Sequence, residues 1–295
     1  MEQKRYHHRR PPGLVLKPAW CYSIVELADL LNRSFADYPV RVLIDGELLA
    51  EKIRTEGIDL KVSRVVVAKT STLGLALLAR RGWTTRVTTM GLAPSVRGRG
   101  VGRWLMERLL VQGRRRGDRR LVLEVIERDT AALRLYDRFG FRVDRRLVGY
   151  SLNGQAPGSP SADSLAKVDI RRVGEMLTIH GGQAHLPWQI SGETVAQLSS
   201  PAQGYRLGPA YAVISDPHPK LITLKALVVE SAFRRQGWTR RLIRALLGRF
   251  PGKSWKVPVL TPEELGAGLF ENLGFKKESI TQLQMSLDLA RPSGT

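Results

Sequence analysis

The sequence carries one pattern twice, and this repeat restricts its possible folds more than any other feature. A loop that reads Arg-Gly-Arg-Gly-Val-Gly at 97–102 has a counterpart in Arg-Arg-Gln-Gly-Trp-Thr at 234–239. Downstream, Phe-Gly-Phe at 139–141 is matched by Leu-Gly-Phe at 273–275. Self-similar segments indicate repeated structural units. We therefore expect two copies of one fold.

The most evident linker lies near the middle of the chain. Residues 153–165 are rich in Gly, Pro and Ser and show no periodicity on which a core could form. The total of 295 residues suits two domains of about 100–150 residues each. We predict an N-terminal domain over 1–152 and a C-terminal domain over 166–295.

Within the first half, apolar strand patterns alternate with helical patterns. Ser23 is a candidate N-cap, and Glu26 completes a capping box with it. The patterns predict helices over 24–35, 101–116 and 130–139, and strands over 63–69, 74–79, 86–93 and 121–126. Each half closes on an alternating segment typical of a half-buried strand, at 147–152 and 283–287. The expected class is a mixed α/β fold.

The chain is strongly basic, with 47 Lys and Arg against 27 Asp and Glu and a net charge of +20. Residues 1–153 hold 30 basic and 16 acidic residues, and residues 154–295 hold 17 and 11. Such a field attracts nucleic acid and other polyanions. The alternative is a compositional bias, since 35 of the 47 basic residues are arginine. The net charge alone does not distinguish polyanion binding from a compositional bias.

Several classes of protein are excluded or disfavoured. Cys21 is the only cysteine, so there is no internal disulfide framework. No apolar run approaches the roughly 18 residues of a membrane helix. No apolar signal-peptide core follows the basic N-terminus, and the histidines lack metal-ligand spacing. We expect a cytoplasmic protein without a metal or a membrane partner.

The loop at 97–102 is the best candidate for a binding site. A glycine turn that opens a helix presents free backbone amides and the positive end of the helix dipole, which suit phosphate. The dinucleotide fingerprint fits poorly, because Arg103 stands where its third glycine is required. A phosphate-binding loop of the Walker A type is absent, since no Gly-Lys-Ser/Thr follows.

Four linked motifs resemble the acetyl-CoA-binding core of the GNAT N-acetyltransferase superfamily. They are residues 92–102, Leu-Glu-Val at 123–125, Asp-x-x-Ala-x-x-Leu-Tyr at 129–136, and Phe-Gly-Phe at 139–141. The resemblance covers about residues 14–152, and its spacing is nearest to bacterial ribosomal-protein alanine N-acetyltransferases. It implies two tandem GNAT-like domains, each a splayed mixed sheet flanked by helices.

The resemblance also implies a cosubstrate, acetyl-CoA, and the residues that hold it. The pantetheine arm would pair with a strand end, and the loop would hold the diphosphate. The residues implied are Met90, Gly91, Leu92, Arg97, Gly98, Arg99, Gly100, Val101, Gly102 and Asp129. Asp129 stands where the family usually has asparagine, and its charge would repel phosphate unless Arg128 or Arg134 offsets it.

Two residues match the catalytic positions of the family. Glu124 matches the general base, acting directly or through water, and Tyr136 matches the general acid that protonates the departing thiolate. The alternatives are a buried carboxylate paired with an arginine and a packing aromatic. In the second half, Pro258 and Phe270 take these positions and Thr239 replaces the last loop glycine. We expect that half to lack independent catalysis; the alternative is that it binds CoA with other catalytic residues.

The resulting hypothesis is an acyl-CoA-dependent N-acetyltransferase that acts on a primary amine of a small molecule, a peptide or a protein. A rival hypothesis is a non-catalytic GNAT-fold protein that binds nucleic acid or an acidic partner through its basic surface. The presence of both Glu124 and Tyr136 favours the enzyme.

Overall fold

A computed structural model describes residues 11–38, 43–154, 165–181 and 186–289. Most of the predicted linker therefore lies outside the described residues. The chain divides into two compact units. The N-terminal unit comprises Met1–Val125, Asp129–Val143 and Met285–Thr295, and the C-terminal unit comprises Ile126–Arg128 and Asp144–Gln284.

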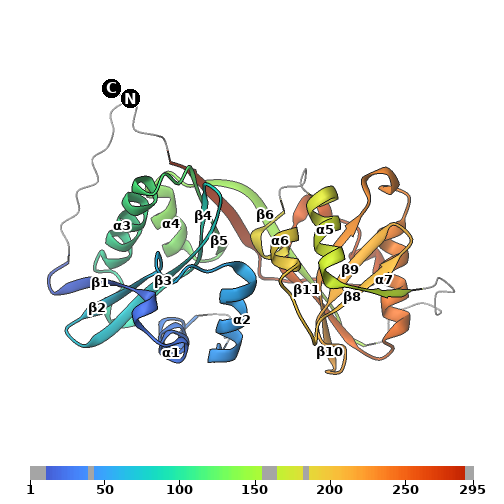
Figure 1. The fold of residues 1–295 in the computed structure, drawn as a ribbon, viewed down its shortest axis with the longest axis horizontal. Helices are drawn as coiled ribbons and strands as arrows, with labels where there is room; N and C mark the ends of the chain where they lie inside the picture. Colours follow the sequence, from blue (N-terminus) through green and yellow to red (C-terminus); the bar gives the residue numbers. More distant parts are fainter. Residues whose placement is uncertain (1–10, 39–42, 155–164, 182–185, 290–295) are drawn as a thin grey trace. The chain divides into compact units, whose positions relative to one another are not determined.

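The N-terminal unit is a mixed sheet with helices on both faces (Figure 1). Its strands follow the order β1-β2-β3-β4-β5-β13, antiparallel from β1 to β4, with β5 parallel to β4. The strands are β1 (Leu14–Pro18), β2 (Arg64–Ala68), β3 (Ser71–Arg81), β4 (Thr84–Leu92), β5 (Arg120–Ile126) and β13 (Gln282–Asp288). The α-helices are α1 (Ile24–Ser34), α2 (Gly46–Glu56), α3 (Val101–Arg115) and α4 (Thr130–Arg138), with short 3₁₀ turns at Ala19–Cys21 and Pro94–Val96.

Local signals account for the helix ends. The predicted capping box is confirmed: the Ser23 side chain accepts from the Glu26 amide, and the Glu26 carboxylate accepts from the Ser23 amide. The patterns did not predict α2 or β1. For α2 the signals are present but local: Asp45 caps its first turn, and Gly57 ends it in the left-handed conformation, with φ of 69°.

The centre of this unit is β3, whose residues Gly74–Ala79 are buried without alternation. A strand buried on both sides reads as a continuous apolar run rather than an alternating one. Helices α1 and α2 cover one face of the sheet, and α3 and α4 cover the other (Figure 1).

Strands β4 and β5 pair only over part of their length. The parallel register joins Thr84–Val87 to Arg120–Leu123 and then ends. On the other side of β4, the pairing with β3 shifts between Leu77 and Leu78. Such a bulge bends a strand away from its neighbour. The end of β4, residues 88–92, therefore has no register with β5.

The C-terminal unit has the strand order β6-β11-β10-β9-β8-β7, with β12 paired to β6. Its strands are β6 (Arg142–Leu152), β7 (Ala166–Val168), β8 (Gln203–Leu207), β9 (Ala210–Ile214), β10 (Leu221–Val229), β11 (Ser254–Pro262) and β12 (Lys276–Lys277). Its helices are α5 (Ile170–Gly181), α6 (Gly192–Val195), α7 (Trp238–Arg249) and α8 (Glu263–Gly266), with 3₁₀ turns at Trp188–Ile190, Ser231–Phe233 and Glu271–Leu273.

Two apolar clusters lie on opposite faces of this second sheet. Along β9, Ala210, Ala212 and Ile214 pack in the cluster that includes α7, whereas Tyr211 and Val213 pack in the cluster that includes α5. Side chains alternate between the faces of a strand, so both faces of β9 are covered.

The C-terminal unit also repeats the parting of two parallel strands. Strand β10 pairs with β11 only from Leu221–Thr223 to Ser254–Lys256, and its pairing with β9 shifts between Leu224 and Ala226. The predicted class and the predicted doubling of one fold are confirmed.

The division into units differs from the boundaries predicted at 152 and 166. The N-terminal unit includes the chain from Met285 onward, where the Leu289 amide donates to the Arg119 carbonyl at 2.8 Å and Arg120 donates to Ser286 at 2.9 Å. Conversely, the chain from Asp144 onward counts with the C-terminal unit, where Tyr150 is in register with Val257. An alternating pattern predicts a strand but does not specify its partner.

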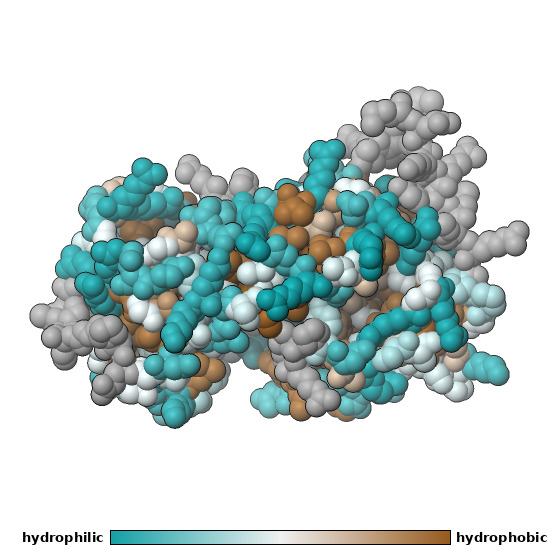
Figure 2. All heavy atoms as spheres, turned by 180° about the vertical axis from the view of Figure 1, so that it is seen from behind, coloured by the Kyte–Doolittle hydropathy of each residue, from teal (hydrophilic) through white to brown (hydrophobic). Residues whose placement is uncertain are grey.

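Hydrophilic side chains dominate the face of the molecule shown in Figure 2, with hydrophobic ones exposed between them in smaller groups. Within the described ranges, no helix combines the length and apolar character that crossing a bilayer requires.

Replacing Leu289 by Ala should loosen the N-terminal unit, although this residue lies at the far end of the chain. Its side chain is 4% exposed, so truncation should cost roughly 2–5 kcal/mol. Amide hydrogen exchange should accelerate in α3 and β5. The control is Leu265→Ala, because Leu265 is 49% exposed. Equal exchange in α3 and β5 of both variants would contradict the assignment of the segment from Met285 to Leu289 to the N-terminal unit.

Candidate functional site

The loop at 97–102 is shaped by two glycines. Gly98 and Gly100 have φ of 71° and 77°, a region that side chains with a Cβ rarely adopt. A Cβ at either position would meet nothing within 4 Å, so conformation rather than crowding requires glycine. Gly100 caps α3 without a side-chain hydrogen bond. The first-turn amides of α3 are therefore available to an anion.

The counterpart loop keeps the same backbone shape in the C-terminal unit. Arg235 has φ of 62° and Gly237 has φ of 81°, at the positions equivalent to Gly98 and Gly100. Gly237 caps α7 as Gly100 caps α3. A left-handed conformation costs a residue with a Cβ about 1–2 kcal/mol. The loop geometry is thus retained even where its sequence no longer favours it.

Arg97 fixes the loop to its surroundings. Its guanidinium donates to the Leu92 carbonyl at 2.9 Å and to the Ser34 carbonyl at 2.8 Å, and forms an ion pair with Asp37 at 2.6 Å. Its side chain therefore joins the end of β4 to the end of α1. Because these contacts occupy the guanidinium of Arg97, an anion at the loop would meet the backbone of this residue rather than its side chain.

In the second copy, Arg234 makes the equivalent contacts. Arg234 donates to the Val229 carbonyl at 3.4 Å, at the end of β10, and to the His180 carbonyl in the last turn of α5. The repeated arginine thus holds each loop between a strand end and a helix end. Sequence reasoning assigned it to phosphate binding because the motif does not show where the side chain points.

The loop, β4 and α4 converge at Gly102. A Cβ at this position would lie 3.5 Å from Leu92 Cδ1, 3.7 Å from Leu135 Cδ2 and 3.8 Å from Met90 Cε. These are ordinary contact distances, so the protein itself does not require glycine here. Leu135 directly precedes Tyr136. The structure therefore brings together Met90, Leu92, Gly102 and Leu135, the residue before Tyr136.

Gly91 serves the packing of α1. A Cβ on Gly91 would lie 2.6 Å from the Phe35 ring and 2.9 Å from Ser34 Cβ. The glycine therefore allows α1 to approach β4 at the point where β4 leaves β5. The packing of α1 therefore requires a glycine at position 91, which the resemblance assigned to binding of the cosubstrate.

Glu124 is buried and paired with an arginine. Its side chain is 4% exposed, and Oε2 accepts from Nε and Nη2 of Arg86, both at 2.8 Å. Arg86 also contacts Glu56 at 2.6 Å, and Lys52 reaches Glu56 at 2.6 Å. These contacts are the ones expected if Glu124 is a buried carboxylate paired with an arginine, the alternative to a general base. Arg86 was not predicted as a partner of Glu124, although an arginine within a predicted strand was the available signal.

These charges influence one another's protonation. Burial opposes the charged form of Glu56, but Lys52 and Arg86 outweigh it and hold the pKa of Glu56 below its usual value. Burial likewise opposes the charge of Arg86, while Glu124 and Glu56 raise the pKa of Arg86 above its usual value. Glu56 and Arg86 therefore both stay ionised at neutral pH.

Tyr136 lies on α4 with 8% of its surface exposed. Its ring packs against Phe141 with centroids 5.6 Å apart. Burial, and secondly the nearby Asp129 charge, raise the pKa of Tyr136 above its usual value. No described residue hydrogen-bonds with its hydroxyl. The phenol is therefore protonated at neutral pH and has a proton to donate.

Asp129 is occupied by local contacts. It caps α4, with Oδ1 accepting from the Ala132 amide at 2.9 Å, and Oδ2 accepts from the Tyr38 hydroxyl at 3.2 Å. Among the described residues, neither Arg128 nor Arg134 forms an ion pair with it. Neither arginine therefore offsets the Asp129 charge through an ion pair, and Asp129 acts as a helix cap.

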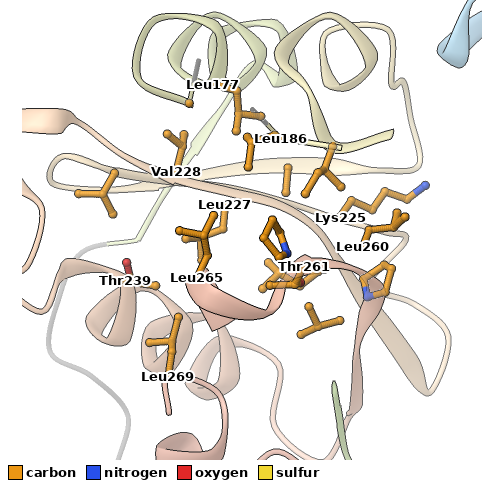
Figure 3. A pocket seen from close by; sticks show the side chains of 18 of the residues that line it. Leu177, Leu186, Lys225, Leu227, Val228, Thr239, Leu260, Thr261, Leu265 and Leu269 are labelled. Atoms are coloured by element: carbon orange, nitrogen blue, oxygen red, sulfur yellow. The ribbon is translucent and has the colours of Figure 1, made fainter. Parts of the chain in front are cut away.

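The equivalent region of the C-terminal unit contains a cavity of about 290 Å³ (Figure 3). Phe270, Pro258 and Thr239 are among its lining residues. The described residues hold no group of three or more His, Cys, Asp or Glu side chains arranged for a metal ion.

Comparisons with known proteins agree with this geometry. Residues 28–141 match the acetyltransferase (GNAT) family. No curated protein matches the chain in sequence. Among solved structures, a GCN5-related N-acetyltransferase from Sphaerobacter thermophilus aligns with a TM-score of 0.67 at 16% identity, covering 95% of this chain and 96% of that one.

Two further structures show the same likeness across both units. A tandem GNAT protein from the clavulanic acid biosynthesis pathway aligns with a TM-score of 0.63 at 15% identity, covering 95% of this chain and 100% of that one. A GCN5-related N-acetyltransferase from Kribbella flavida aligns with a TM-score of 0.60 at 16% identity, covering 95% and 73%. The match to the GNAT family is thus confined to residues 28–141. As a whole it has the fold of a tandem GNAT protein.

Proposed function

We propose that the N-terminal unit is an acyl-CoA-dependent N-acyltransferase that moves an acetyl group from acetyl-CoA to a primary amine of a small molecule or peptide. The observation that carries this proposal is a convergence. The amide-bearing loop, the end of β4 that is free of β5 and helix α4, which carries Tyr136, lie together in a region that matches the GNAT family.

The residues present fit acetyl-CoA. Gly98 and Gly100 leave the first-turn amides of α3 open to a diphosphate, and no side chain caps them. The end of β4 beyond Val87 is free of β5, so its backbone is available to an extended arm, as in strand addition. When bound, acetyl-CoA supplies an acetyl group activated as a thioester.

Transfer requires one proton to leave the acceptor and one to reach the sulfur. The neutral amine attacks the carbonyl carbon, a C–N bond forms, and the C–S bond breaks. The Tyr136 phenol donates its proton to the departing thiolate, and a backbone amide near Leu92 stabilises the oxyanion. Since the Glu124 side chain is 4% exposed and held by Arg86, it removes the acceptor proton through water rather than by direct contact.

The direct test is a panel of amines and N-terminal peptides scored by release of CoA thiol, alongside calorimetry with acetyl-CoA. We expect acetyl-CoA to bind and at least one acceptor class to release thiol. Absence of acetyl-CoA binding would overturn the proposal.

Gly102→Thr copies the residue of the second unit, Thr239, into the first. Its Cβ meets only ordinary contacts, so folding should persist, while the branched side chain occupies the cosubstrate path. We expect acetyl-CoA affinity to fall at least tenfold by calorimetry, about 1.4 kcal/mol. Gly248→Thr, at an exposed glycine of α7, is the matched control. Equal affinities in the two variants would contradict the placement.

Tyr136→Phe should lower kcat about 10²–10⁴-fold, because it removes the proton donor while preserving the ring that packs on Phe141. The Kd for acetyl-CoA should not change. Tyr205→Phe, which removes a phenol hydroxyl in the C-terminal unit, is the control. Full turnover by Tyr136→Phe would remove the acid assignment.

Glu124→Gln and Glu56→Gln form a matched pair, because both remove a buried carboxylate bound to Arg86. Each should lower the free energy of unfolding by roughly 1–3 kcal/mol. We expect only Glu124→Gln to lower kcat by tenfold or more in the CoA-release assay. Equal losses of kcat would show that Glu124 is structural.

A further inference from the structure

The C-terminal unit contains a cavity that acetyl transfer by the N-terminal unit does not explain. It opens where β10 and β11 part, beyond the paired segment Leu221–Thr223. Figure 3 shows side chains from both faces of β10 around it. Seven leucines contribute much of the wall: Leu177, Leu186, Leu224, Leu227, Leu260, Leu265 and Leu269. Leu265 is 49% exposed, so the cavity reaches the surface.

The chemistry of the wall suits holding a ligand rather than reacting with it. Phe270 and Pro258 line the cavity at the positions equivalent to Tyr136 and Glu124. Neither side chain can give or take a proton. None of the described lining residues carries a carboxylate.

The cavity also carries positive charge without a carboxylate to balance it. Lys225 forms no ion pair within the described part of the chain, and Figure 3 shows its ammonium group at the edge of the cavity, directed outward. The guanidinium of Arg234 donates to carbonyls only, whereas its counterpart Arg97 is paired with Asp37. An anionic group at the mouth would supply the missing charge.

A diphosphate is a poor fit for this anion. Thr239 places a branched side chain in the cavity wall where Gly102 leaves space in the first unit (Figure 3). The wall is otherwise dominated by aliphatic groups. These features favour a long apolar group with one small anionic end.

The volume sets the size of that group. A cavity of about 150 Å³ lined by Leu, Ile and Phe holds benzene, with its six carbon atoms. The present cavity, about 290 Å³, is nearly twice as large. By proportion it accommodates an aliphatic chain of about ten to twelve carbons.

We propose that the C-terminal unit binds a medium-chain aliphatic carboxylate, with its chain among the leucines and its carboxylate at Lys225. This site is separate from the proposed transferase site and does not depend on its activity. Binding buries methylene groups, and each buried methylene contributes a nearly constant increment of affinity.

The test is calorimetry of the full chain with saturated carboxylates of 6, 8, 10 and 12 carbons, below their micelle-forming concentrations. We expect one saturable site. Affinity should rise about fourfold for each added methylene up to about ten carbons and then level off. Absence of saturable binding would overturn the proposal, as would a continued rise with no plateau, which indicates non-specific adsorption.

Two variants locate the site. Leu227→Trp fills the cavity and should abolish binding, with circular dichroism to confirm folding. Lys225→Gln leaves the core intact and should weaken binding roughly 3- to 10-fold. Lys220→Gln, at an exposed lysine, should not change the affinity. Unchanged binding in both Leu227→Trp and Lys225→Gln would overturn the proposal.

A final comparison separates this site from a second cosubstrate site. Acetyl-CoA is titrated into the native chain and into Leu227→Trp. We expect at most one acetyl-CoA per chain in both. Two per native chain and one per Leu227→Trp chain, without carboxylate binding, would overturn the proposal in favour of a CoA site. Loss of acetyl-CoA binding alone would contradict only the proposed transferase.

Discussion

The parting of two parallel strands is the constraint on which both units depend. In each unit a strand pairs with its parallel neighbour for three or four residues and then diverges, next to a register shift against its antiparallel neighbour. The divergence leaves backbone and apolar side chains without a partner strand. In the first unit this occurs beside a loop of open amides and helix α4, and in the second it occurs at an apolar cavity.

Comparison of the two copies distinguishes features that the fold requires from features that the proposed chemistry requires. Both retain the arginine that ties the loop to a strand end and a helix end, and both retain left-handed residues in the loop, although Arg235 is strained there. These features are therefore structural. The copies differ where a ligand would bind, with Gly102 in the first and Thr239 in the second. They also differ where a proton would be donated, with Tyr136 in the first and Phe270 in the second. The second copy thus keeps the scaffold but not the residues that we propose handle the ligand and the proton in the first.

Much of the fold could be predicted because its signals are local. The capping box at Ser23, the loop glycines and the apolar strand patterns depend on neighbours in sequence, and the structure bears them out. Helix α2 was not predicted because its pattern is weak, although Asp45 and Gly57 bound it. Site residues were named from a resemblance, but side-chain directions were not predictable. Arg97 points to α1, and Asp129 caps α4.

By itself, the sequence determined that one α/β pattern occurs twice and that only the first copy retains a glycine at 102 and a phenol at 136, because these are matters of residue identity and spacing. Tertiary structure alone decided that Arg86 holds Glu124, and that the chain from Met285 onward belongs with the first unit. It also decided that the second copy encloses a cavity. Each of these depends on contacts between residues distant in the chain, which local patterns do not specify.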